Sequence, residues 1–141
     1  MNLQELNSKI QDLTKKAFSS SLEVNNKTKH NVFFDFSGHV DKVNVTIHYN
    51  SWKSDDEKME LYFQYRNEVL NNGSKPLSFS DWKRKSDLLK ISRFEWYSNS
   101  WSEGEFEDPE NISYDLAYKY YFGDIVECIK ELESLLIEES D

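Results

Sequence analysis

Residues 31–52 read NVFFDFSGHVDKVNVTIHYNSW, and this stretch decides the fold. From Val43 to Tyr49 every second residue is apolar or aromatic, which is the period of a strand with one buried face. Residues 32–37 alternate in a similar way, with the even-numbered positions apolar. Gly38 supplies the backbone freedom that a tight reversal needs. The stretch therefore predicts a β-hairpin whose second strand buries its odd-numbered side chains.

Three further segments are predicted as strands from the same period. Residues 59–65 and 112–122 alternate apolar or aromatic with polar positions, and residues 91–98 do so around Phe94 and Trp96. The odd positions of 59–65 match those of the hairpin's second strand, which predicts that the two are neighbours. Residues 91–98 and 112–122 are expected to pair with each other. The alternative for 112–122 is a helix with Ile112, Leu116 and Tyr120 on one side. We favour the strand, because a helix leaves the other apolar and aromatic residues of this segment scattered.

Helices are predicted at both ends of the chain and once in its middle. Leucine, isoleucine and alanine recur at three- and four-residue steps over residues 3–17, and again over 125–136 after Asp124, which we expect to cap the last helix. Ser80 or Asp81 is expected to cap a short helix over residues 82–91. Residues 19–30 are predicted as a loop, with a short strand at residues 21–24 as the alternative for that part. The order α-β-β-β-α-β-β-α predicts one α+β domain, residues 1–141. It is a mostly antiparallel sheet of about five strands with an N-terminal and a C-terminal helix packed on it.

Charge is distributed unevenly along the chain. Residues 1–102 carry 15 basic and 13 acidic side chains, whereas residues 103–141 carry 2 basic and 13 acidic ones, and the whole has a net charge of −9. Phosphate binding draws its affinity from clustered lysine and arginine. This balance argues against nucleic acid as the direct ligand and indicates a basic protein partner, or a role in solubility alone.

The number of cysteines and the length of the apolar segments indicate the cellular compartment of the protein. Cys128 is the only cysteine, so an internal disulfide is excluded and a reducing cytoplasm fits; the residue falls in a helical apolar pattern and is expected to be buried. No apolar run approaches the roughly 20 residues that span a bilayer. The N-terminus also lacks the basic residues followed by an apolar segment that are typical of a signal peptide. The sequence predicts a soluble, intracellular protein with no membrane association.

Candidate chemistry is sparse. The histidines His30, His39 and His48 stand nine residues apart, and the best metal or acid/base candidate is His39 with Asp35 and Asp41. Zinc sites normally have closely spaced histidine and cysteine ligands, which this set lacks. The other interpretation of His39 is a turn residue that bonds to backbone. No phosphate-binding glycine loop or nucleophile motif is present, and we expect no metal or cofactor and no catalytic residue.

The segment WYSNSWSEGEFEDPEN, residues 96–111, combines carboxylates with aromatic side chains. In an extended chain, carboxylates two residues apart project to the same side about 6.6 Å apart, so the row resembles the charge of a nucleic-acid strand. Aromatic side chains often supply much of the binding energy of interfaces. One interpretation is a solvated hairpin tip. The other is that this loop, with the acidic last helix, occupies a basic nucleic-acid cleft on another protein. The candidate partner-binding residues are Glu103, Glu105, Glu107, Asp108, Glu110, Trp96, Trp101 and Phe106.

Lys83, Arg84 and Lys85 form a basic cluster beside Trp82. Three charges on a short helix are typical of a solvated face, which we favour, and a phosphate contact is the alternative.

The run VFFDFSGHVDKVNVTIHYNSW, residues 32–52, resembles a pattern of small uncharacterised proteins of phages and mobile elements in low-GC Gram-positive bacteria. The shared features are an F-x-F-S-G-H-V turn, an alternating strand and a tryptophan. Residues 67–90 do not fit the pattern. The resemblance carries no activity onto any residue. It implies a host cell cytoplasm, where small acidic proteins inhibit host defence nucleases, as anti-CRISPR proteins do.

Together these observations lead to the hypothesis of a non-enzymatic, acidic inhibitor that binds a basic nucleic-acid-handling protein, such as a host nuclease effector, and blocks its nucleic-acid site. An immunity protein against a nuclease toxin would show the same charge pattern. A small metal-assisted hydrolase centred on Asp35, His39 and Asp41 is the alternative from another class. A third option is a structural or scaffolding role through the first or the last helix, which predicts self-association.

Overall fold

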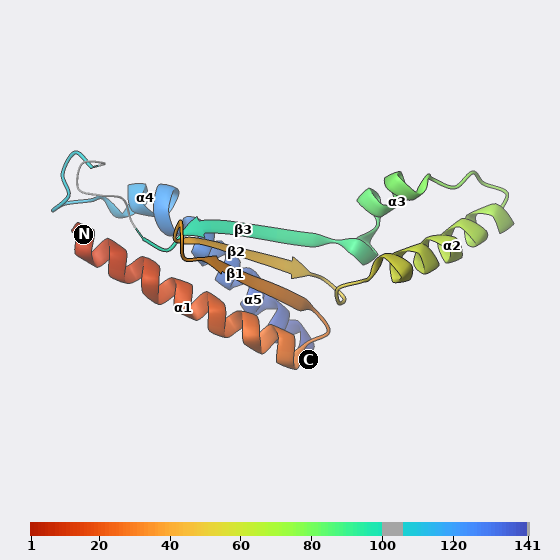
Figure 1. Cartoon of the computed structure of the whole chain (residues 1–141), viewed down its shortest axis with the longest axis horizontal. Coiled ribbons are helices and arrows are strands. Elements are labelled where there is room, and N and C mark those ends of the chain that lie inside the picture. The colour runs from red at the N-terminus through yellow and green to blue at the C-terminus, as the bar shows by residue number, and fades with distance from the viewer. Residues whose placement is uncertain (100–105, 141) are drawn as a thin grey trace.

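The computed structural model describes residues 1–99 and 106–140. Its three strands form one antiparallel sheet in the order β1-β2-β3, and α1 and α5 lie side by side on one face of that sheet (Figure 1). A 3-10 turn (Asp87–Leu89) precedes β3, and a π-helical turn (Tyr118–Phe122) links α4 to α5. The elements are α1 (Leu3–Lys27), β1 (Asn31–Ser37), β2 (Lys42–His48), α2 (Asp55–Asn71), α3 (Phe79–Lys85), β3 (Ile91–Tyr97), α4 (Tyr114–Ala117) and α5 (Gly123–Ser140).

The predicted hairpin is confirmed as β1 and β2. In the register, Val45 lies opposite Phe34 on β1 and opposite Phe94 on β3. Val43, Val45 and Ile47 are fully buried, as the odd-numbered alternation of the second strand predicted. β2 is therefore the central strand, and its buried face meets the helices.

The core lies between this face and the two long helices. α1 buries Leu6, Ile10, Ala17 and Val24, and α5 buries a matching stripe that includes Cys128. The expected loop over residues 19–30 is wrong for residues 19–27, because α1 continues to Lys27. The buried hydroxyl of Ser21 donates to the Ala17 carbonyl at 2.7 Å, so a polar position is accommodated inside the helix.

The third predicted strand, residues 59–65, is instead part of helix α2. Ser54 caps this helix by accepting a hydrogen bond from the Glu57 backbone N–H at 3.2 Å, and three acidic residues occupy its first turn. Such caps and charges stabilise a helix start. The half-buried positions Leu61, Tyr65 and Val69 then recur every four residues. The alternation of aromatic residues was a coincidence of composition.

The fifth predicted strand, residues 112–122, is also helical. Ser113 caps α4 by accepting from the Leu116 backbone N–H at 3.1 Å, and the chain continues through the π-helical turn into α5. Asp124 therefore lies inside a helical run and does not cap it. The sheet has three strands in the described residues, and residues 91–98 pair with β2, not with residues 112–122.

Helices α2 and α3 form an arm that projects from one end of the sheet (Figure 1). α2 buries no residue, and the arm is held by a cluster of aromatic rings in which Tyr62 and Tyr65 contact Trp82 at centroid distances of 5.5 and 6.0 Å. The short helix was predicted near residues 82–91. It lies at Phe79–Lys85 and is capped by Ser78. The chain passes through this arm before it returns to the sheet as β3.

Candidate functional site

The described part of the predicted acidic loop, residues 106–111, lies at the end of the sheet opposite the arm (Figure 1). Glu107, Asp108 and Glu110 are exposed there. The Asn111 backbone N–H donates to the Asp108 carbonyl at 3.1 Å, so residues 108–111 form a turn and not the extended row that was expected. Trp101, Glu103 and Glu105 lie outside the described residues.

Two of the predicted aromatic anchors belong to the core. Trp96 is 5% exposed, and its Nε1 donates to Thr14 Oγ1 at 2.9 Å. Phe106 is half-buried against the core, with its ring 5.4 Å from that of Tyr121. In this structure neither ring is placed to anchor a partner from the surface.

Two other aromatic side chains and one leucine take the exposed positions. Tyr114, Leu116 and Tyr120 are 56%, 48% and 63% exposed, next to the exposed carboxylates of Asp115 and Asp124. The strand interpretation missed them because it placed all even positions of 112–122 on a buried face. The helical alternative for this segment is the one that gives the correct backbone for residues 114–122. We define the acidic end as these exposed residues together: Glu107, Asp108, Glu110, Asp115, Asp124, Tyr114, Leu116 and Tyr120.

Helix α5 contributes less negative charge than its composition suggests. Glu133 pairs with Lys16 at 3.3 Å, and Glu127 pairs with Lys130 at 3.5 Å. The Tyr118 hydroxyl donates to Glu127 Oε1 at 2.8 Å and lowers the pKa of this carboxyl, so Glu127 stays ionised and its charge is offset by Lys130. By contrast, the five carboxylates of the acidic end have no ion pair within the part of the chain that the structure describes.

The proposed metal triad is not assembled. His39 is exposed in the turn between β1 and β2, and Asp41 Oδ2 accepts a hydrogen bond from Asn99 Nδ2 at 2.8 Å. His30 is buried, and its Nδ1 accepts from the Asn50 backbone N–H at 2.9 Å. Among residues 1–99 and 106–140, no group of three histidine, cysteine, aspartate or glutamate side chains is placed to hold a metal ion.

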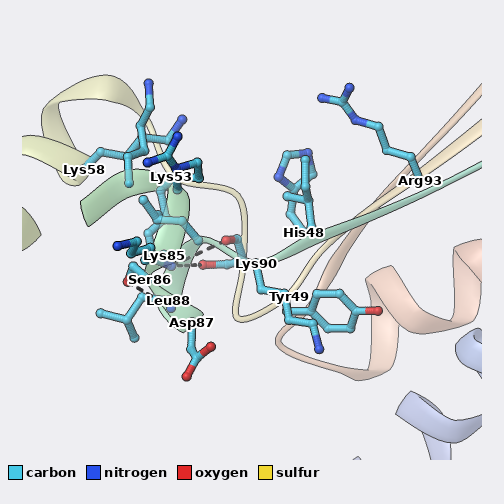
Figure 2. Close-up of a pocket in the computed structure, with 15 residues that line it drawn as sticks. His48, Tyr49, Lys53, Lys58, Lys85, Ser86, Asp87, Leu88, Lys90 and Arg93 are labelled. Atoms are coloured by element: carbon cyan, nitrogen blue, oxygen red, sulfur yellow. Dashed lines mark hydrogen bonds between the residues drawn. The ribbon is translucent and has the colours of Figure 1, made fainter. Parts of the chain in front are cut away.

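A concave basic site lies at the other end of the sheet, where the arm joins it. The cavity has a volume of about 650 Å³ and is lined by seven lysine and arginine side chains, one carboxylate, Asp87, and His48. In Figure 2, Lys58, His48 and Arg93 project to one side of the cavity and Asp87 to another. We call this site the basic cleft, with the cationic residues Lys53, Lys58, Lys83, Arg84, Lys85, Lys90 and Arg93.

The fold brings these residues together from distant parts of the sequence. The Tyr49 backbone N–H, just after β2, donates to the Lys90 carbonyl, just before β3, at 3.2 Å. Lys53 Nζ donates to the Asn50 carbonyl at 2.6 Å and so holds the turn where Asn50 and Ser51 have positive φ values of 61° and 75°. These contacts hold the C-terminal end of β2 and the start of β3 in place next to α3. The basic cluster predicted from the sequence contains three of the seven cations, and no pattern in the sequence places the other four beside them.

The pKa of His48 shows the effect of the positive charges in the basic cleft. Partial burial lowers the pKa of its imidazole, and the positive charges of Lys58 and Arg93 lower it further. Lys58 is in α2 and Arg93 is in β3, so cations from two separate elements act on one ring.

Comparison with protein-family models, with curated proteins and with solved structures found no match to this chain. Within the described residues, no helix is both long and apolar enough to cross a membrane. The geometry and charge of the two ends of the molecule are therefore the guide to its function.

Proposed function

We propose that the protein is a non-enzymatic inhibitor that docks its acidic end on a basic nucleic-acid-handling protein and blocks the nucleic-acid site of that protein. The observation that supports this is the combination of five exposed carboxylates, without ion pairs in the described residues, and the exposed side chains of Tyr114, Leu116 and Tyr120. The partner would be a host nuclease effector, as for an anti-CRISPR or another anti-defence factor, or a nuclease toxin.

The two kinds of side chain have different roles in such a complex. Carboxylates attract a basic surface from a distance and raise the association rate, and this effect weakens with salt. Aromatic side chains bury large areas at low entropic cost and slow dissociation. A surface that carries both suits an inhibitor that competes with a polyanion.

The test replaces Glu103, Glu105, Glu107, Asp108 and Glu110 together by serine and measures binding to two purified basic proteins, a CRISPR effector nuclease and a nuclease toxin, over a series of salt concentrations. We expect the affinity to fall by roughly tenfold or more and its salt dependence to flatten. Stability should change by less than about 0.5 kcal/mol for each described position, because these side chains are exposed.

A matched control removes the same charge elsewhere and should leave the affinity close to that of the wild type. It replaces Asp12, Glu23, Asp35, Glu60 and Glu68 by serine, all of which are exposed. Equal affinity of the first variant and the wild type, or equal losses in both variants, would remove the carboxylates of residues 103–110 from the mechanism. Tighter binding to one of the two nucleases assigns the class of partner.

A further inference from the structure

Three cations of the basic cleft are available to an external anion. Arg84 pairs with Asp81 at 2.8 Å, Lys53 is engaged by its own turn, and the ammonium groups of Lys83 and Lys90 lie over aromatic rings. Within the described residues, Lys58, Lys85 and Arg93 have no carboxylate partner. They come from α2, α3 and β3, so their charges converge from three directions on one cavity.

A cavity of about 650 Å³ exceeds what one phosphate group needs. Several cations spread along an open cavity match a chain of phosphates, since each neutralised phosphate releases counterions and adds to the affinity. The net charge of −9 does not prevent this. The acidic end lies one strand length away, roughly 20 Å for seven residues, and charges are screened over roughly 8 Å at physiological salt.

The basic cleft continues onto the outer face of the sheet, which points away from α1 and α5. Phe33 is 44% exposed on this face, with its ring 5.1 Å from that of His48. Across the sheet, Phe33 lies opposite Thr46, and Thr46 lies opposite Arg93. An exposed aromatic ring thus lies on the same face as Arg93 and His48, which line the basic cleft.

We infer that the basic cleft and the adjoining outer face of the sheet bind single-stranded nucleic acid, with Lys58, Lys85 and Arg93 on the phosphates and Phe33 stacked on a base. A single strand exposes the faces of its bases to aromatic side chains, whereas a duplex hides them in its own stack. This inference is independent of the function proposed above, because it concerns the other end of the molecule.

The first experiment measures the fluorescence anisotropy of labelled single-stranded DNA and RNA of mixed sequence over a salt series. Replacing Lys58, Lys85 and Arg93 together by serine should weaken binding by roughly tenfold or more and reduce the salt slope by about 2, since each phosphate contact on a single strand contributes about 0.7. The matched control replaces Lys15, Lys27 and Lys119, which are exposed outside the cleft, by serine. It should keep most of the affinity and the slope.

The second experiment tests the stacking contact. Phe33→Ala should weaken binding by roughly fivefold or more, and Phe33→Trp should restore it. Phe36→Ala is the control, because Phe36 is exposed on the same strand but its side chain belongs to the opposite face. Both positions are exposed, so loss of folding is not expected to explain a difference between them.

His48 gives a readout that net charge alone would not produce. The ring is surrounded by Lys58 from α2, Arg93 from β3 and Phe33 from β1. Phosphates that offset the two cations should raise the pKa of His48 in an NMR titration of the complex relative to that of the free protein. By linkage, affinity should increase as the pH falls through the range in which His48 gains its proton.

Four outcomes would overturn the inference. The first is no binding to single strands at low salt, and the second is an equal loss of affinity in the cleft and control triple variants. The third is tighter binding to a duplex than to the single strand. The fourth combines two results: inorganic polyphosphate displaces the labelled strand as efficiently as the unlabelled oligonucleotide does, and Phe33→Ala leaves the affinity unchanged. Failure of these tests leaves the acidic end unaffected, because that surface is tested on proteins and not on nucleic acid.

Discussion

Ile47→Ala is expected to lower the free energy of unfolding by about 2–5 kcal/mol. Ile47 is fully buried on the central strand, where it lies opposite Val32 and Ser92 and faces the helical layer. Truncation removes the transfer free energy of three carbon atoms and leaves a cavity in a close-packed core. Denaturant melts followed by circular dichroism measure the change.

Two neighbouring substitutions check the register on which this prediction depends. Thr46 is half-buried on the outer face, so Thr46→Ala should cost clearly less than Ile47→Ala. Phe34 is also half-buried, and Phe34→Ala should lie between the two. A strand that is shifted by one residue exchanges its two faces, so a larger cost at Thr46 than at Ile47 would show that the register is wrong.

The hairpin was predictable because its two strands are adjacent in sequence and each has one buried face. Val43, Val45 and Ile47 recur with a period of two because every second side chain of a strand points to the same face, and that face is buried here. The same period led to errors at residues 59–65 and 112–122. There, Ser54 and Ser113 cap helices by accepting from backbone N–H groups, and these local hydrogen bonds favour the helix. Alternation is therefore informative only where no cap precedes it.

The candidate sites differ in how far the sequence could define them. The acidic end is largely local in sequence, and three of its carboxylates, Glu107, Asp108 and Glu110, were among the predicted residues. The expected anchors Trp96 and Phe106 are buried and half-buried instead. The basic cleft is assembled from Lys58, Lys85 and Arg93, which belong to three elements. No sequence pattern identifies such a site, because its cations are far apart in the sequence. The net charge does not reveal it either, because that sum combines the acidic and the basic surfaces that the fold separates. The folded structure was needed to see it.

Gly123→Ala is expected to destabilise the protein by about 1–3 kcal/mol, although glycine to alanine inside a helix normally stabilises by about 1 kcal/mol. The reversal of sign comes from the π-helical turn. The Gly123 N–H donates to the Tyr118 carbonyl, and a Cβ added at position 123 would lie 2.5 Å from that carbonyl oxygen and 3.2 Å from two carbons of the Tyr118 ring. The oxygen belongs to the backbone and is held by the hydrogen bond, so the helix would have to shift.

Thermal and denaturant melts of Gly123→Ala measure this effect, and Tyr118→Ala in the same background separates its two causes. If the Tyr118 ring is responsible, the second substitution should recover much of the lost stability. If the backbone oxygen is responsible, the loss of stability should persist. We expect the second result, because 2.5 Å is far shorter than a van der Waals contact. A strand ending at Gly123, as the sequence predicted, would place no Tyr118 oxygen against the new methyl group. A stabilised Gly123→Ala would therefore refute the π-helical connection between α4 and α5, and with it the exposed positions of Tyr114 and Tyr120 on which the acidic end depends.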